Sequence, residues 1–277
     1  MSKRSKQKII IKTPEEIFFI RKSCQILAEI LKELKRNVKP GISAAELDKL
    51  AREMTYSSNA QPAFLGYQGY PAALCVSVND EVVHALPLKT KILKEGDIVS
   101  LDYGVIWPTR KSPEFSQLKN LDYKRNKGFY SDAAITVKVG NISPQKQRLT
   151  EVTENSLARA ISILRPGVKI SDVGSTIQLF VESYGFQVVR DLVGHGVGCE
   201  LHEEPEIPNW RWSGQGTTFR ENMVIAIEPM ISLKDKYVEL GGDGYAYVTA
   251  SGSPAAHFEK SILITRDGSE VLTKWDE

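Results

Sequence analysis

Helix-start signals and apolar positions at helical spacing mark the beginning of the chain. The sequence TPEE from Thr13 is a capping box with proline at the first helical position. Apolar residues then recur every three or four positions as far as Leu34, so we predict a helix that ends near Arg36. A second capping box, SAAE from Ser43, predicts a second helix soon after the first.

The hydrophobic period then changes to one that is typical of strands. Five segments are short, rich in β-branched residues and bounded by turn signals: 74–78, 98–106, 133–139, 224–231 and 261–264. Two further helices are expected among these strands. One begins at Ser143, which is followed by proline but lacks the Glu or Gln partner of a capping box, and the other begins near Ser171.

Three pairs of segments repeat at nearly one offset. VKPGISAAEL resembles LRPGVKISDV 126 residues later, and GDIVSLD, ending at Asp102, resembles NMVIAIE, ending at Glu228, at the same offset. DAAITV from Asp132 resembles EKSILI from Glu259 at an offset of 127 residues. Chance similarity is the alternative, but an acidic residue stands at the matching end of each strand pair. We therefore predict an α+β fold of two duplicated ααββ halves, related by a pseudo-two-fold, with a curved, mostly antiparallel sheet covered by helices.

The repeat places four carboxylates at equivalent strand ends. A lone carboxylate there is usually solvated, but two facing halves would bring all four to one point. Buried carboxylates that converge repel one another, and two divalent cations would remove that cost. Three of the four histidines precede these strands in Gly- or Pro-marked segments: His84, His195 and His202. Imidazole with carboxylates is a normal ligand set for a transition metal, whereas the glycines around His195 lack the GK[ST] sequence of a phosphate loop.

Composition and charge fit one globular domain over residues 1–277. The formal net charge is only +2, so we expect no nucleic-acid or membrane surface, and no apolar run approaches the length of a membrane span. Residues 1–12 contain too few apolar positions for a signal peptide and are expected to form a solvated N-terminal arm. Three widely spaced cysteines form no CxxC pair, which favours a reducing, cytoplasmic location.

Taken together, these segments resemble the bacterial type I methionine aminopeptidases, within the pita-bread metallopeptidase family. Five segments carry the resemblance: FLGYQGYPAALCVSVNDEVVHALP, EGDIVSLDYGV, DLVGHGVGCELHEEPEIPNW, ENMVIAIEPM and HFEKSILIT. The resemblance implies the pita-bread fold and removal of the initiator methionine by two-metal-assisted hydrolysis of the first peptide bond, with a preference for small penultimate residues. It also implies a monomer that acts on the N-termini of nascent polypeptides, a task that would bring it to the ribosome.

The resemblance further implies roles for individual residues. Five of them stand in the family's order and would bind two divalent metals: Asp102, Asp132, His195, Glu228 and Glu259. Asp132 and Glu259 would bridge the metals, and Glu228 would assist proton transfer. His202 would stabilise the tetrahedral intermediate, and His84 would help the leaving amine. Mn, Fe or Co suits these ligands, and Zn is left open.

An apolar pocket for the methionine side chain is also implied. Its candidate residues, each with core packing as the alternative, are Tyr67, Tyr70, Cys75 and Leu201, together with Phe64 and Tyr245. The chain departs from the family's common residues at three places near the site. Gln68 stands in place of histidine, Ala85 in place of glycine, and Leu201 in place of a larger aromatic residue.

The link between the first two carboxylate strands is longer than the family's short hairpin. Residues 105–128 are expected to form a charged surface insert, with a partner-docking or gating element as the alternative. Two rival functions also stay open. An X-Pro aminopeptidase or prolidase would share the LDYGV and HGVG motifs but usually carries an additional N-terminal domain. A binding protein on this fold would have lost metal ligands, and none of the five is replaced here.

Overall fold

The computed structural model describes residues 8–120, 128–212 and 216–275. Its helices are α1 (Pro14–Asn37), α2 (Ala44–Ser57), α3 (Pro144–Ser162) and α4 (Ile170–Glu182), with the 3-10 helices η1 (Tyr67–Gly69) and η2 (Pro113–Asn120). The longer strands are β2 (Leu74–Val78), β4 (Ile98–Trp107), β5 (Phe129–Lys138), β8 (Glu203–Ile207), β9 (Val224–Ile227) and β14 (Lys260–Ile264). The shorter strands are β1 (Gln61–Pro62), β3 (Glu81–Val83), β6 (Gln187–Val188), β7 (Gly194–Gly196), β10 (Met230–Ser232), β11 (Val238–Leu240), β12 (Tyr247–Thr249), β13 (Ala255–His257) and β15 (Ser269–Val271).

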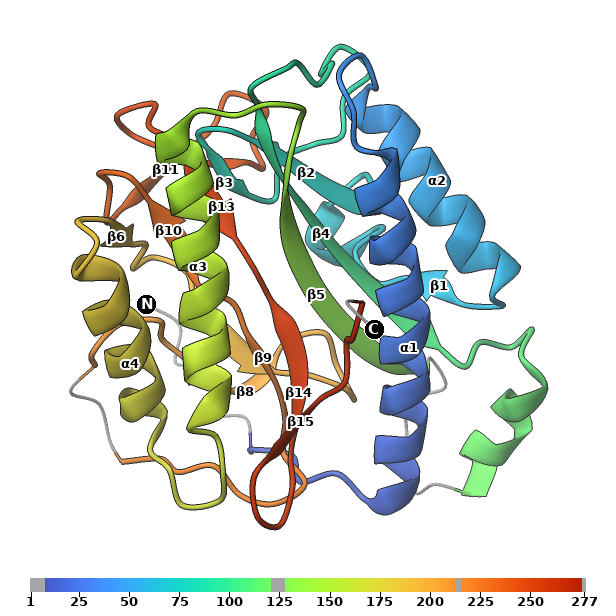
Figure 1. Ribbon diagram of the computed structural model, residues 1–277. Helices are drawn as coiled ribbons and strands as arrows, with labels where there is room; N and C mark the ends of the chain where they lie inside the picture. The colour runs from blue at the N-terminus through green and yellow to red at the C-terminus, as the bar shows by residue number, and fades with distance from the viewer. Residues whose placement is uncertain (1–7, 121–127, 213–215, 276–277) are drawn as a thin grey trace.

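The four α-helices lie over one side of the strands, with β5 and β14 running between the two helix pairs (Figure 1). One sheet has the order β1-β4-β2, with β5 also paired to β4, and another has the order β15-β14-β9-β7-β8. Two small sheets, β13-β10-β6 and β11-β12-β3, complete the strands of the described residues. All of these pairs are antiparallel, so the predicted α+β class is confirmed.

The helix starts form as the capping motifs predict. The Thr13 hydroxyl accepts a hydrogen bond from the Glu16 backbone N–H at 3.2 Å, and the Glu16 carboxylate accepts one from the Thr13 N–H at 2.8 Å. Ser43 and Glu46 form the same reciprocal box at α2, whereas Ser143 caps α3 with its hydroxyl alone. Such a cap contributes about 1 kcal/mol to helix stability. The stripe that α1 buries includes Ile17, Ile20, Cys24, Leu27, Leu31 and Leu34.

The two predicted halves meet where β5 runs beside the start of β14. The Glu259 N–H donates to the Ala134 carbonyl oxygen at 2.9 Å, and the Ala134 N–H donates to the Glu259 carbonyl oxygen at 3.4 Å. The Ser261 hydroxyl adds a bond to the Asp132 carbonyl oxygen at 2.7 Å. This junction places Asp132 of the first half beside Glu259 of the second.

The strand boundaries differ from the prediction at the carboxylates. Asp102 lies inside β4, as the predicted strand over residues 98–106 implies, rather than at its end. β5 begins at Phe129, before Asp132, because β4 and β5 pair along their whole lengths. In the second half the prediction of one strand over residues 224–231 is wrong. The chain leaves β9 at Glu228 and Pro229 before β10 begins, since proline cannot donate a ladder hydrogen bond.

The end of the N-terminal arm and the start of the insert also differ from the prediction. Lys12 is only 3% exposed, so the expectation of a solvated arm as far as residue 12 is wrong at its last residue; residues 1–7 lie outside the described part of the chain. Residues 105–107 belong to β4 because their side chains are buried, and the insert therefore starts at residue 108. The first part of the insert docks on the end of α2, where the Thr109 and Ser112 hydroxyls donate to the Asn59 carbonyl oxygen at 2.7 and 2.9 Å. Residues 121–127 of the insert are not described.

One large hydrophobic core joins the two halves, and a smaller one lies between β3, β10 and β13. The large core contains residues of α1 to α4 and of β4, β5, β9 and β14, so these elements pack as one body around the strand junction. No helix among the described residues is both long and apolar enough to span a membrane.

Candidate metal centre and active site

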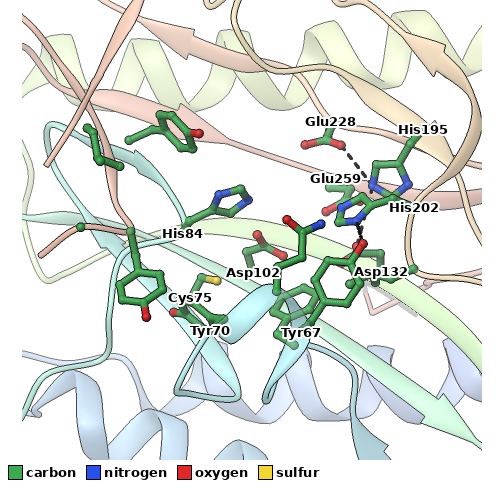
Figure 2. A pocket seen from close by; sticks show the side chains of 17 residues that line it. Tyr67, Tyr70, Cys75, His84, Asp102, Asp132, His195, His202, Glu228 and Glu259 are labelled. Carbon is green, nitrogen blue, oxygen red and sulfur yellow. Dashed lines mark hydrogen bonds and ion pairs between the residues drawn. The ribbon is translucent and has the colours of Figure 1, made fainter. Parts of the chain in front are cut away.

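Five ionisable side chains from both halves converge at one end of a pocket (Figure 2). Asp102 comes from β4, Asp132 from β5 and His195 from β7, while Glu228 follows β9 and Glu259 precedes β14. The oxygen atoms of Asp102, Asp132 and Glu259 lie within 4.8 Å of one another. The ligand atoms of His195, Glu228 and Glu259 form a second group within the same distance. The structure therefore brings together all five side chains that the resemblance identifies as metal ligands.

Close packing around β7 explains the glycines that flank His195. A Cβ atom on Gly194 would lie 2.5 Å from the Ala226 carbonyl oxygen, and one on Gly196 would lie 2.5 Å from the Glu204 carbonyl oxygen. Only glycine allows the backbone to approach its neighbours this closely. The glycines thus seat His195 between β8 and β9, and they need no phosphate ligand to account for them.

In the absence of a cation, burial shifts the carboxylates of this cluster towards their neutral forms. Burial raises the pKa of Asp102 to about 7. Burial, followed by repulsion from neighbouring carboxylates, also raises the pKa of Asp132, Glu228 and Glu259. Three oxygen atoms are buried without a hydrogen-bond partner: Asp102 Oδ1, Asp132 Oδ1 and Glu259 Oε1. Orphaned acceptors that face one another fit divalent cations, which offset both the repulsion and the missing hydrogen bonds.

His195 supplies a nitrogen lone pair to the same cluster. Its Nδ1 lies 2.9 Å from the Gly196 carbonyl oxygen, which can only accept, so Nδ1 carries the proton. Burial lowers the pKa of His195 to about 4, and the ring is therefore neutral. The unprotonated Nε2 lies 3.5 Å from Glu228 Oε1 and 3.9 Å from Asp132 Oδ2. A lone pair directed at carboxylate oxygens is repulsive unless a cation lies between them, so these residues fit a metal.

His202 and His84 lie on opposite sides of the pocket (Figure 2). His202 Nδ1 lies 2.8 Å from the Tyr67 hydroxyl oxygen, and the His202 ring centre is 4.3 Å from that of His195. Burial within the pocket, and then the neighbouring imidazoles, lower the pKa of His202, although part of the residue is exposed to solvent. His84 has a φ of +61° and packs edge-to-face on Tyr247. This left-handed backbone conformation is uncommon for a non-glycine residue and occurs here at the pocket wall.

The trio of Asp132, His195 and His202 also brings its ligand atoms within 4.8 Å. His202 is thus close enough to the cluster to be considered as a sixth ligand. The hydrogen-bond partner of the His202 ring, however, is Tyr67 of the pocket wall and not one of the carboxylates.

The pocket has a volume of about 390 Å³ and contains every residue that the sequence assigned to methionine binding. Tyr70 and Cys75 are almost fully buried in its wall, and the Tyr70 hydroxyl donates to the Ala85 carbonyl oxygen at 3.1 Å. Burial raises the pKa of the Cys75 thiol well above its usual value, which leaves the sulfur protonated and a poor nucleophile. Gln68 also lines the pocket, whereas Ala85 is buried behind it.

Sequence reasoning missed several residues of the site. Leu240, Gly244 and Tyr247 line the pocket from the β11–β12 hairpin, of which the sequence analysis named only Tyr245. His257 received no role, yet its Nε2 lies 3.7 Å from Glu228 Oε2, and neither ring nitrogen has a hydrogen-bond partner. A signal for it did exist, because His257 and Glu259 are two residues apart and alternate residues of an extended chain share a face.

Comparison with known proteins of similar sequence and structure identifies the family of this chain. The sequence model of metallopeptidase family M24 matches residues 19–110 and 120–266, and the gap falls within the insert. Methionine aminopeptidase 1 of Bacillus subtilis is 41% identical over 266 residues, which cover 96% of this chain and 99% of that protein. The methionine aminopeptidase of Aquifex aeolicus is 43% identical and covers 94% of this chain and 96% of its own.

The chain belongs to the methionine aminopeptidases of metallopeptidase family M24. The crystal structure of the methionine aminopeptidase from Thermotoga maritima agrees, with a TM-score of 0.88 and 45% identity over 96% of this chain and 100% of that one. The prolidase of Pyrococcus horikoshii has a TM-score of 0.69 at 23% identity and covers 97% of this chain but 64% of the prolidase, which shows a common fold alone. The pita-bread fold is thereby confirmed, and the methionine aminopeptidase branch is favoured over the prolidase alternative.

Proposed function

We propose that this metallo-aminopeptidase removes the initiator methionine from nascent proteins by hydrolysing the first peptide bond. The observation that carries the proposal is the position of the five-residue cluster at one end of a pocket with apolar and aromatic walls. A pocket of about 390 Å³ is at the small end for a ligand site, which suits one side chain rather than a long peptide. The relatives named methionine aminopeptidase support the same activity.

Two divalent cations fit the cluster, held by the four carboxylates and His195. Asp132, His195 and Glu259 each belong to two of the three close groups of ligand atoms. Of these three, only Asp132 and Glu259 have two oxygen atoms each, so these two carboxylates would be able to contact both cations. When bound, such cations supply a water nucleophile at neutral pH and polarise the carbonyl of the scissile bond. Oxygen donors with a single imidazole favour Mn, Fe or Co, and Zn is compatible with them.

The pocket walls orient the substrate. Tyr67, Tyr70, Cys75 and Leu201 surround the space for the methionine side chain, with Phe64 and Tyr245 beside them. Cys75 of β2 pairs directly with Asp102 of β4, so the wall of the side-chain pocket adjoins the carboxylate cluster. A substrate whose first side chain fills this pocket places its free amine and first peptide bond at the cluster, which explains the removal of one residue only.

Three side chains handle protons and developing charge. The neutral His202, held by Tyr67, has Nε2 available to face the carbonyl oxygen and stabilise the oxyanion. His84, on the opposite wall, is placed to assist the leaving amine. Glu228 lies beside His195 at the cluster, where its ionised carboxylate would accept a proton from the attacking water once cations are bound.

We also infer a cytoplasmic monomer that meets its substrates as they leave the ribosome, because initiator methionine is carried by new chains. A preference for small penultimate residues belongs to the same proposal. A non-catalytic binding protein is disfavoured, because all five candidate ligands are present and converge.

The test is peptide cleavage by metal-stripped protein after addition of Mn, Co, Fe or Zn. Peptides that begin Met-Gly, Ala-Gly and Gly-Pro are compared, and released amino acids are quantified. Metal-dependent release of methionine alone is the expected result. Release from the Gly-Pro peptide would instead assign the X-Pro activity, and no release with any metal would favour a binding protein.

A further inference from the structure

Lys12, two residues before the start of α1, makes a buried ionic contact with the opposite half of the molecule. The Lys12 ammonium pairs with the Glu203 carboxylate, and their side chains are 1% and 2% exposed. The Lys12 backbone N–H also donates to the Asn222 carbonyl oxygen at 2.9 Å. Because the next residue, Thr13, is the N-cap of α1, the Lys12 backbone is fixed on both sides. Lys12 thus reaches Glu203 from a rigid support.

Glu203 closes the loop that carries two residues of the pocket. Its Oε1 accepts hydrogen bonds from the Cys199 N–H at 2.6 Å and the Glu200 N–H at 2.9 Å, while its Oε2 faces Lys12. Leu201 and His202 lie between these bonded ends, and both line the pocket. The Glu203 carboxylate therefore fixes the path of residues 199–202, because it binds the backbone N–H groups of Cys199 and Glu200 at the start of this loop.

The same loop packs directly on the N-terminal segment. A Cβ atom on Gly198, whose φ is +131°, would lie 2.5 Å from Ile20 Cδ1 of α1 and 3.2 Å from Lys12 Cε. The Gly198 carbonyl oxygen accepts from the Tyr130 N–H at 2.7 Å. Lys12 therefore contacts the loop at both ends: its side chain lies close to Gly198, and its ammonium pairs with Glu203.

We propose that Lys12 is a positioning residue, which acts through Glu203 to hold His202 at the reacting carbonyl. A charge-assisted hydrogen bond to a buried carboxylate is stronger than a neutral one, so the cation keeps Glu203 in place for its two backbone bonds. His202 is the residue directly before Glu203, and its ring must meet the Tyr67 hydroxyl at 2.8 Å. A shift of the loop moves this ring away from the substrate. The inference rests on the proposed function, because that function gives His202 its role.

The experiment replaces Lys12 in the full chain. Lys12→Met removes the cation, Lys12→Gln keeps a hydrogen-bond donor and guards against a variant that does not fold, and Lys12→Arg restores the charge. The matched control is Arg21→Met, which removes the partly exposed ion pair between Arg21 of α1 and Glu270 of β15, with N···O at 2.7 Å. For each protein we measure kcat and KM on a Met-Gly peptide, bound metal, and the imidazole nitrogen NMR signals of His202 in metal-free protein.

Loss of the cation should lower kcat by about tenfold to a hundredfold, the range expected when a stabilising group is displaced by about 1 Å. KM and metal content should stay within about twofold of the parent, since Lys12 contacts neither pocket nor cluster, and Lys12→Arg should recover most of the kcat. The His202 signals should change in Lys12→Met and Lys12→Gln but not in Arg21→Met.

Two results would overturn the inference. One is unchanged His202 signals in both neutral variants, which would show that Lys12 does not position this ring. The other is a loss of metal in proportion to kcat, which would make Lys12 a general support of the fold. Because the NMR signals are read without substrate or metal, they test the positioning even if the parent protein fails to cleave the peptide.

Discussion

The metal-free protein should become less stable as pH rises, and Asp102 allows the effect to be measured at one residue. Asp102 is buried on β4, which pairs with β2 and β5, and its Oδ1 has no hydrogen-bond partner. Burial raises its pKa from 3.8 to about 7. Each pKa unit corresponds to about 1.4 kcal/mol, so ionising Asp102 in the folded protein costs about 4 kcal/mol of stability.

The sign of this effect follows from the direction of the shift. Because the folded-state pKa is higher than the unfolded one, the stability from the neutral form is complete below about pH 4. It is lost progressively as pH rises to about 7. Asp102→Asn keeps the shape of the side chain and removes the ionisation, so the metal-free variant should match the parent near pH 4 and exceed it by up to about 4 kcal/mol at pH 8.

Urea unfolding of metal-free parent and variant, followed by circular dichroism between pH 4 and 8, measures this difference. Added Mn at pH 8 should stabilise the parent by occupying the cluster and should stabilise the variant much less, because a ligand that binds only the folded state shifts the unfolding equilibrium. The reasoning would be refuted if the difference in unfolding free energy between the parent and Asp102→Asn did not vary with pH. It would mean that Asp102 is already charged and satisfied in the metal-free fold.

Three further predictions concern catalysis. His202→Ala should lower kcat by about a hundredfold, the cost of losing one donor to an oxyanion, while metal analysis shows unchanged content; loss of metal would make His202 a ligand. Tyr67→Phe removes the hydroxyl that contacts His202 Nδ1 and should lower kcat less than His202→Ala does, with a larger effect on kcat than on KM; a change in KM alone would assign Tyr67 to methionine binding. Met-Gly peptides should be cleaved faster than Met-Lys peptides in the same assay, and equal rates would contradict the preference for small penultimate residues.

Local signals predicted the helices well, and the sequence repeat predicted that the carboxylates lie together. The capping boxes at Thr13 and Ser43 depend on residues three positions apart, so their hydrogen bonds were readable from the sequence and are present in the structure. The repeat offset also placed the carboxylates correctly in relation to one another. It brought Asp132 and Glu259 together because both halves follow the same strand order, and their shared junction lies at the predicted residues.

Features that depend on long-range contacts could not be predicted in the same way. β5 begins at Phe129, four residues before the predicted segment, because β4 continues to pair with it there, which no local pattern reports. In the pocket wall formed by β11 and β12, the resemblance identified only Tyr245, because Leu240, Gly244 and Tyr247 follow no motif. Lys12 looked like the end of a solvated arm because its partner, Glu203, is 191 residues away.

The central claim is that this carboxylate and histidine cluster forms the metal centre that releases methionine. Its most direct test is methionine release from a Met-Gly peptide by metal-stripped parent and Asp132→Asn proteins, each measured before and after reloading with Mn, with bound metal determined in the same samples. The account predicts no release before reloading, restored release in the parent, and neither full metal loading nor activity in Asp132→Asn. Full activity in the variant, or in the parent without metal, would contradict it.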